Sequence, residues 1–129
     1  MLRAADGIYG LQASILRTLA SPRRLEIVHL LGRGPVEVHQ LAEELGVSQP
    51  NVSAHLAALR AVGLVEPIRD GRDVRYRLTD QEIVVACDMV REVLARRLER
   101  LRVMVASTRD PEETDTYTED ARPAGIGVQ

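Results

Sequence analysis

The chain has 129 residues, of which 45% are hydrophobic and 28% charged, and its formal net charge is −2. These totals predict one domain with a modest core, and the absence of Phe and Trp argues against stacking on unpaired bases. A single cysteine, Cys87, excludes an intrachain disulfide framework and is typical of a reducing compartment. We recognise no signal peptide, membrane-spanning run or catalytic motif, so we expect a cytoplasmic protein that binds no membrane and is not an enzyme.

Charge is unevenly distributed along the chain. Residues 1–108 contain 15 Arg and 13 acidic residues, whereas residues 109–129 contain 2 Arg and 6 acidic residues. The acidic segment lacks periodicity and contains two prolines, so we expect residues 108–129 to be a disordered tail. Residues 1–7 are predicted to be a flexible N-terminus, which leaves residues 8–107 for the folded domain.

Two helices are predicted at the start of the domain. An apolar stripe at helical spacing predicts a helix over residues 8–19; its members are Ile8, Leu11, Ile15 and Leu19. Ser21-Pro22 then supplies an N-cap and a first helical residue for a second helix that ends near Leu31. The inward residues of this second helix are predicted to be Leu25, Val28 and Leu31.

Residues 37–62 are typical of a helix-turn-helix, because the helical spacing of apolar residues is interrupted at Gly46 and then resumes. We expect Ser48 to cap a second helix that begins at about Gln49. The inward stripe of that helix is predicted to be Val52, Leu56 and Leu59.

The outer face of this helix carries only small residues, namely Pro50, Ala54, Ala57 and Ala61. Polar side chains flank that face: Gln49, Ser53 and Arg60 on one side, Asn51 and His55 on the other. Such a helix suits the major groove of DNA, where amides bind base edges and arginine binds guanine or phosphate. Helix propensity on a solvated surface would also place alanines there.

A β-hairpin is predicted next, because residues 64–69 and 73–78 flank the tight-turn signal Asp70-Gly71. Four arginines and three acidic residues give this hairpin, or wing, a net charge of only +1. Arg69 and Arg72, at or beside the tip, are candidates for contact with the minor groove or a phosphate. We interpret Arg77 as part of a solvated edge.

A long helix is predicted from Asp80 to about Ser107, capped by Thr79 or Asp80. Its apolar stripe is Ile83, Cys87, Val90, Leu94, Leu98, Leu101 and Val105. A stripe of this length exceeds what the small domain can cover, so we expect it to pair with its own copy in a homodimer, together with Leu11 and Ile15. A twofold dimer places two recognition helices about one duplex turn apart, as a palindromic operator requires.

The order of these elements, together with three segments, resembles the ArsR/SmtB family of bacterial winged-helix repressors. The segments are LASPRRLEIVHLL at 19–31, VSQPNVSAHLAALRAVGLV at 47–65 and RDGRDVRYRLTD at 69–80. The resemblance implies a mainly α winged helix-turn-helix fold with a small β-hairpin. It also implies a transcriptional repressor that binds double-stranded DNA. It also places Ser48, Gln49, Asn51, Ser53 and His55 on the DNA-reading helix, and Arg72 and Arg75 on the wing.

Family members commonly release DNA when an inducer, often a metal ion, binds. Where metal-sensing relatives have a Cys-x-Cys pair, this chain has Glu37-Val38-His39, and only half of a second familiar site remains, at Asp80-Gln81-Glu82. One cysteine cannot build the three-thiolate site that arsenic or cadmium needs. No cofactor is required, and the candidate ligands for nickel, cobalt or zinc are Glu37, His39, Asp80 and Glu82. His39 is otherwise interpreted as a surface or DNA-backbone residue.

Two alternatives stay open from the sequence. Cys87 either packs as a small hydrophobic residue or meets its copy in an interchain disulfide that switches a repressor. The weak positive charge of the hairpin also fits a protein-interaction module that acts with a partner regulator.

Overall fold

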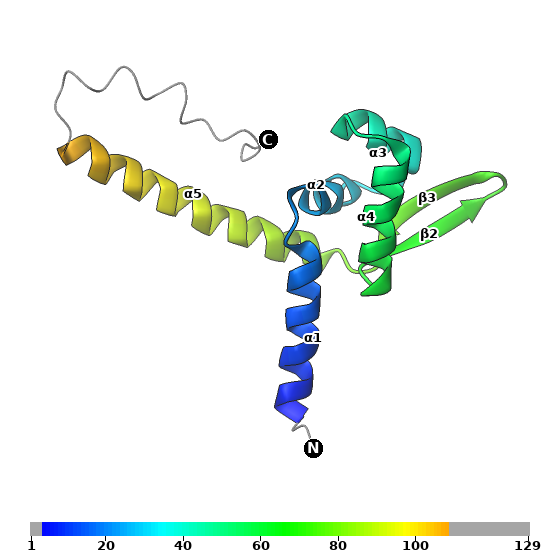
Figure 1. Ribbon diagram of the computed structural model, residues 1–129, viewed down its shortest axis with the longest axis horizontal. Coiled ribbons are helices and arrows are strands. Elements are labelled where there is room, and N and C mark those ends of the chain that lie inside the picture. The colour runs from blue at the N-terminus through cyan, green and yellow to red at the C-terminus, as the bar shows by residue number, and fades with distance from the viewer. Residues whose placement is uncertain (1–3, 109–129) are drawn as a thin grey trace. The chain divides into compact units, whose positions relative to one another are not determined.

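The computed structural model describes residues 4–108, with side chains from Gly7 to Ser107 (Figure 1). Its helices are α1 (Ala4–Leu19), α2 (Pro22–Leu31), α3 (Val38–Leu45), α4 (Gln49–Ala61) and α5 (Glu82–Thr108), and its strands are β1 (Val36–Glu37), β2 (Val65–Asp70) and β3 (Asp73–Leu78). Residues 1–3 of the predicted N-terminus and residues 109–129 of the predicted tail lie outside the described range. The chain divides into two compact units at Cys87, so the first unit contains everything up to the first turns of α5.

Helix α1 begins four residues earlier than the apolar stripe predicts, at Ala4 rather than Ile8. Residues 4–7 carry no large apolar side chain, so periodicity alone cannot place this boundary. Helix α2 begins as expected, because Pro22 occupies its first turn and the Ser21 hydroxyl accepts a hydrogen bond from the Arg24 backbone N–H.

The buried face of α2 differs from the prediction at one position. Leu25 is 43% exposed, and Ile27 is fully buried in its place beside Val28 and Leu31. Both sets of three residues have helical spacing, so the sequence does not distinguish them. The packing of α2 against α1, α3 and α4 selects the arc that contains Ile27.

The core of the first unit is formed by all the elements from α1 to β3 except β1. Its buried residues are Leu19, Ile27, Val28, Leu31, Leu41, Ala42, Leu45, Val52, Leu56, Leu59, Leu64, Val65 and Leu78. The three residues predicted to face inward from α4 are all among them. Each is at most 1% exposed, so the predicted orientation of this helix is confirmed.

Helices α3 and α4 form the helix-turn-helix, and Gly46 makes the turn between them. Gly46 has a φ of 68°, in the left-handed region that glycine adopts without steric penalty. The adjoining Val47 N–H donates to the Ala42 carbonyl at 3.1 Å, which closes the end of α3. Figure 1 shows α4 running beside the base of the hairpin, in agreement with its contacts to β2.

The hairpin belongs to a three-stranded antiparallel sheet in the order β1-β3-β2. The sequence does not predict strand β1, because two residues after Pro35 are too few to show alternation. The turn is also one residue later than expected: Asp70 pairs with Asp73, so Gly71 and Arg72 form the loop. Gly71 supplies the positive φ, at 64°.

Helix α5 begins at Glu82, two residues later than predicted. The Asp80 carboxylate accepts from the Glu82 N–H at 2.9 Å and so serves as the cap, whereas the Thr79 hydroxyl donates to the Gly63 carbonyl at 2.6 Å. Ile83, Val84 and Cys87, on the first turns of α5, pack against the core of the first unit.

Within the second unit, residues 88–107 of α5 are mostly exposed. Ion pairs three residues apart line the helix, Asp88 with Arg91 and Glu99 with Arg102. The hydrogen bond and the charge of Arg102 lower the pKa of Glu99 below its ordinary value. Over the described residues, no helix combines the length and hydropathy needed to cross a membrane.

Candidate nucleic-acid interface

The N-terminus of α4 is capped and carries no negative charge. The Ser48 hydroxyl accepts from the Asn51 N–H at 3.3 Å, as the sequence predicts, and the first turn contains no acidic residue. Ser48, Gln49 and Asn51 are all exposed. The remaining free backbone N–H groups and the helix dipole make this end of α4 favourable for a phosphate group.

The small-residue face of α4 is exposed along its whole length. Its members are Pro50, Ala54, Ala57 and Ala61, and the flanking Ser53 and Arg60 are exposed as well. No large side chain prevents this face from approaching another surface closely. The placement agrees with the prediction, while the contact of each side chain with DNA stays a prediction.

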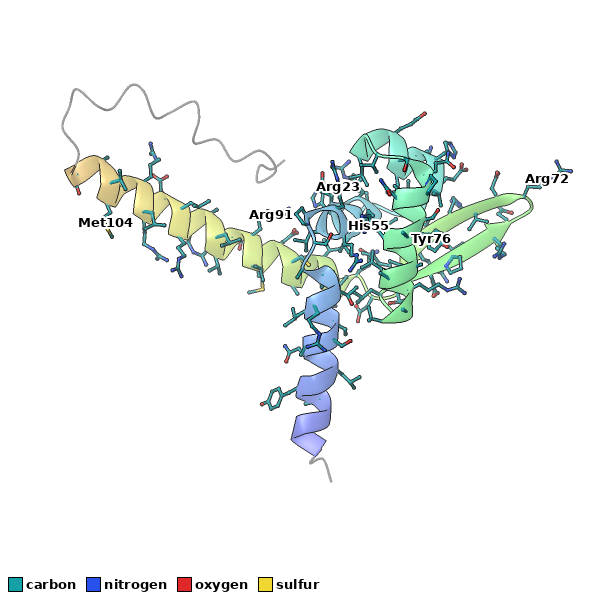
Figure 2. All side chains as sticks on the ribbon, viewed as in Figure 1. Arg23, His55, Arg72, Tyr76, Arg91 and Met104 are labelled. Carbon is teal, nitrogen blue, oxygen red and sulfur yellow. The ribbon has the colours of Figure 1, made fainter. Side chains whose placement is uncertain are left out.

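His55 differs from the other candidates on α4, because it is half-buried and held by the protein. Its Nδ1 accepts a hydrogen bond from Arg24 Nε at 3.2 Å, and in Figure 2 it lies between α4 and α2. Motifs and periodicity in the sequence do not identify Arg24 as part of this site. The only available signal was its position on α2, four residues before the inward-facing Val28.

The arginines of the hairpin occupy different environments. Arg69 and Arg72 are exposed, and Figure 2 shows Arg72 extending from the tip. Arg75 is half-buried on the central strand, opposite Ile68 on one side and Glu37 on the other. Arg77 forms an ion pair with Glu66 at 3.2 Å and is exposed, so it is solvated as expected, although it lies on the central strand β3 and not at an edge of the sheet.

The candidate metal ligands form no complete site. His39 Nδ1 lies 3.0 Å from the Glu37 carboxylate, but Asp80 uses its carboxylate to cap α5. Among residues 4–108 no three His, Cys, Asp or Glu side chains gather in a group that could hold an ion. Glu37 and His39 therefore offer at most a pair of ligands within one chain.

The residues predicted to form a dimer interface fall into two groups. Ile15, Ile83 and Cys87 are half-buried against the core of their own chain. The others expose large apolar side chains at 45–69% of their surface: Leu11, Val90, Leu94, Leu98 and Leu101. The second group is therefore the more accessible to another surface.

Similar proteins are found both by sequence and by structure, and both point to the same family. The family model for "Bacterial regulatory protein, arsR family" matches residues 21–66, from the cap of α2 into β2. The HTH-type transcriptional repressor SmtB of Mycobacterium tuberculosis is 46% identical over 69 residues, or 54% of this chain, and the chain spans about half (51%) of the length of that relative. The HTH-type transcriptional regulator CmtR of Mycobacterium bovis is 43% identical over 84 residues, which cover 64% of this chain and 71% of CmtR.

A solved structure resembles the fold over a longer range. It is the solution structure of the homodimeric winged helix-turn-helix DNA-binding domain of a possible ArsR-family transcriptional regulator from Mycobacterium bovis. The match has a TM-score of 0.70 at 30% identity and covers 78% of this chain and 93% of that domain.

Proposed function

The chain belongs to the arsR family of bacterial regulatory proteins, and we propose that it is a homodimeric repressor of transcription that binds a specific sequence in double-stranded DNA. The observation that carries this proposal is the exposed alanine face of α4, with Gln49 and Asn51 at its capped end. A helix with this face can lie deep in a major groove while its amides meet base edges. The similarity to SmtB, named a transcriptional repressor, and to the homodimeric DNA-binding domain from Mycobacterium bovis supports the same conclusion.

The exposed apolar stripe of α5 supports self-association. Val90, Leu94, Leu98 and Leu101 are 45–61% exposed on one side of a helix of 27 residues. A second copy of this helix has the same spacing, so the two stripes match each other about a twofold axis. In the proposed complex the twofold axis relates two copies of α4, and each copy reads one half-site.

The proposed mechanism combines base reading with phosphate contacts. Helix α4 reads base edges, while Arg69 and Arg72 of the hairpin hold the backbone of the duplex. Occupancy of the operator then excludes RNA polymerase from the same DNA. The chain acts by binding, without a catalytic step, and needs no partner regulator to reach the DNA.

Selection of duplexes from a random pool by the purified chain tests this proposal. We expect enrichment of an inverted repeat whose half-site centres lie about 10 base pairs apart, the spacing that two recognition helices of a twofold dimer require. Enrichment of a single unrepeated site would contradict the dimeric mode. A pool that stays random unless a cellular extract is added would favour the partner-dependent alternative.

We further propose that a metal effector, where one controls release, is nickel, cobalt or zinc rather than arsenic or cadmium. The support is the donor chemistry: Glu37 and His39 supply oxygen and nitrogen, and the only thiol, Cys87, packs against the core. Elemental analysis and metal-by-metal titration of the complex with the selected duplex test this. Release by cadmium alone would contradict it.

A further inference from the structure

Arg24 stands where three helices meet. Its backbone N–H donates to the Ser21 hydroxyl that caps α2, and its Nη1 donates to the Thr18 carbonyl near the end of α1 at 3.1 Å. Its Nε donates to His55 Nδ1, in the middle of α4, at 3.2 Å. One half-buried guanidinium therefore connects the end of α1 and the start of α2 to the helix that we propose reads DNA.

This contact determines which nitrogen of His55 carries the proton. A ring nitrogen that accepts a hydrogen bond from a guanidinium carries no hydrogen, so the neutral imidazole is protonated on Nε2. Within the described residues no group accepts a hydrogen bond from Nε2. The buried side-chain atoms without a partner do not include Nε2, so this nitrogen is not buried. His55 thus presents one N–H donor to the solvent.

The position of His55 indicates a phosphate rather than a base as the acceptor. His55 follows Ala54 by one residue, so it points about 100° away from the small-residue face and toward α2. A donor on this flank in the middle of the helix faces the DNA backbone beside the groove, whereas Asn51 stands on the same flank at the capped end, which approaches the base edges. A phosphate oxygen accepts from Nε2–H. It repels the lone pair that the other tautomer would present, and a flipped ring would offer it a carbon-bound hydrogen in place of the N–H.

We propose that Arg24 is a positioning residue for DNA binding, which holds His55 so that its Nε2–H donates to a phosphate of the duplex. This inference rests on the proposed function. Without the Arg24 contact the imidazole is free to flip and to exchange tautomers, so only part of the population presents a donor. Arg24 contributes through the orientation of His55 and not through its own charge.

The substitution Arg24→Lys separates orientation from charge. Lysine keeps the positive charge, but a single ammonium lacks the planar fork that reaches the Thr18 carbonyl and His55 together. We expect a five- to tenfold loss of affinity, on the order of one hydrogen bond, for the selected duplex, with an unchanged dependence of affinity on salt. The matched control is Arg33→Lys at an exposed arginine just after α2, which should change affinity by less than about twofold.

A double-mutant cycle tests whether Arg24 acts through His55. His55→Ala removes both the ring nitrogen that Arg24 holds and the proposed donor to the phosphate. In that background Arg24→Lys should alter affinity by less than about twofold, because nothing is left for Arg24 to orient. Full loss of affinity from Arg24→Lys in the His55→Ala background would overturn the inference.

A spectroscopic measurement without DNA tests the arrangement in the unaltered chain and in Arg24→Lys. Long-range ¹H–¹⁵N correlation at about pH 8.5, two units above the ordinary histidine pKa of about 6.5, reports the tautomer of each of the 3 histidines. We expect His55 to be protonated on Nε2, and a shift toward a mixture in Arg24→Lys. The opposite tautomer in the unaltered chain would overturn the inference.

Failure of the unaltered chain to bind any duplex would remove the proposed function as well, whereas unchanged affinity in Arg24→Lys overturns only the role of Arg24.

Discussion

At the scale of the residue, the side chains around α4 divide into those already held by the protein and those free to meet a ligand. The Ser48 hydroxyl caps the helix and His55 is held by Arg24. Within residues 4–108, Gln49, Arg60 and Arg72 make no side-chain hydrogen bond or ion pair. These free side chains lose no internal contact when they bind DNA, so their full hydrogen-bonding capacity is available to it.

Arg72→Ala should weaken binding to every duplex sequence by a similar factor. Arg72 is exposed at the tip of the hairpin and has no acidic partner within the described residues, so its expected contact is a phosphate, which carries no sequence information. The slope of log affinity against log salt should fall by about 1. Fluorescence anisotropy over a series of salt concentrations measures both quantities.

Arg77→Ala is the matched control on the same hairpin. Arg77 is paired with Glu66, so its charge is already partly compensated. We expect its removal to change the salt slope by less than about half of the effect of Arg72→Ala. Equal effects of the two substitutions would show that the hairpin contributes only its general charge.

Several residues of the site could be predicted from the sequence, and one could not. Ser48 follows from the rules for N-caps, and the exposed face of α4 follows from counting around a helix from Val52. Arg24 depends on a contact between residues 31 positions apart, which no local pattern encodes. The burial of Ile27 rather than Leu25 also depends on contacts between distant residues, because only the packing between helices decides which of the two faces of α2 is buried.

At the scale of the element, the cap of α4 is the feature that local chemistry determines most directly. Ser48→Ala removes the oxygen that accepts from the Asn51 N–H, and we expect it to lower the free energy of unfolding by about 1 kcal/mol. Ser53→Ala, at an exposed site inside the same helix, should be neutral or slightly stabilising because alanine has the higher helix propensity. Urea denaturation followed by circular dichroism compares the two, and equal destabilisation would contradict the assignment of the cap.

The buried face of α2 gives a second comparison within one helix. Ile27→Ala should lower the free energy of unfolding by about 2–5 kcal/mol, because it leaves a cavity in a fully buried position. Leu25→Ala, at a position that is 43% exposed, should lower it by less than about 1 kcal/mol. The same denaturation experiment measures both, and the reverse order would contradict the burial of Ile27 in place of Leu25.

The strands show which parts of the sheet local sequence patterns predict and which they do not. The hairpin is predicted because Asp70-Gly71 is a tight-turn signal between two extended segments, although the register places the turn one residue later. Strand β1 is two residues long and exists only because β3 offers it an edge, with Val36 opposite Tyr76. A strand whose partner lies 40 residues away cannot be recognised from its own two residues.

At the scale of the whole molecule, the proposed activity depends on pairing two chains through α5. Leu94→Glu places a charge in the apolar stripe at a position that is 48% exposed in the single chain. We expect it to leave the unfolding of the winged helix unchanged and to abolish self-association at micromolar concentration, because two carboxylates would face each other without partners. Sedimentation equilibrium measures the association.

Ala95→Glu is the control, since it introduces the same charge one residue away and about 100° around the helix. This chain should remain associated. Operator affinity should fall with self-association, and hence in Leu94→Glu alone. Normal association of Leu94→Glu would place the interface on another face.

The most direct test of sequence-specific DNA binding is the affinity of the purified chain for two duplexes at one moderate salt concentration. One is the duplex enriched by selection, and the other is a scrambled duplex of the same length and composition. We predict that the selected duplex binds at least about 10³-fold more tightly, the lower end of the range for specific DNA-binding proteins. Equal affinities would contradict the claim that α4 reads base sequence and would reduce the interaction to attraction between arginines and phosphates.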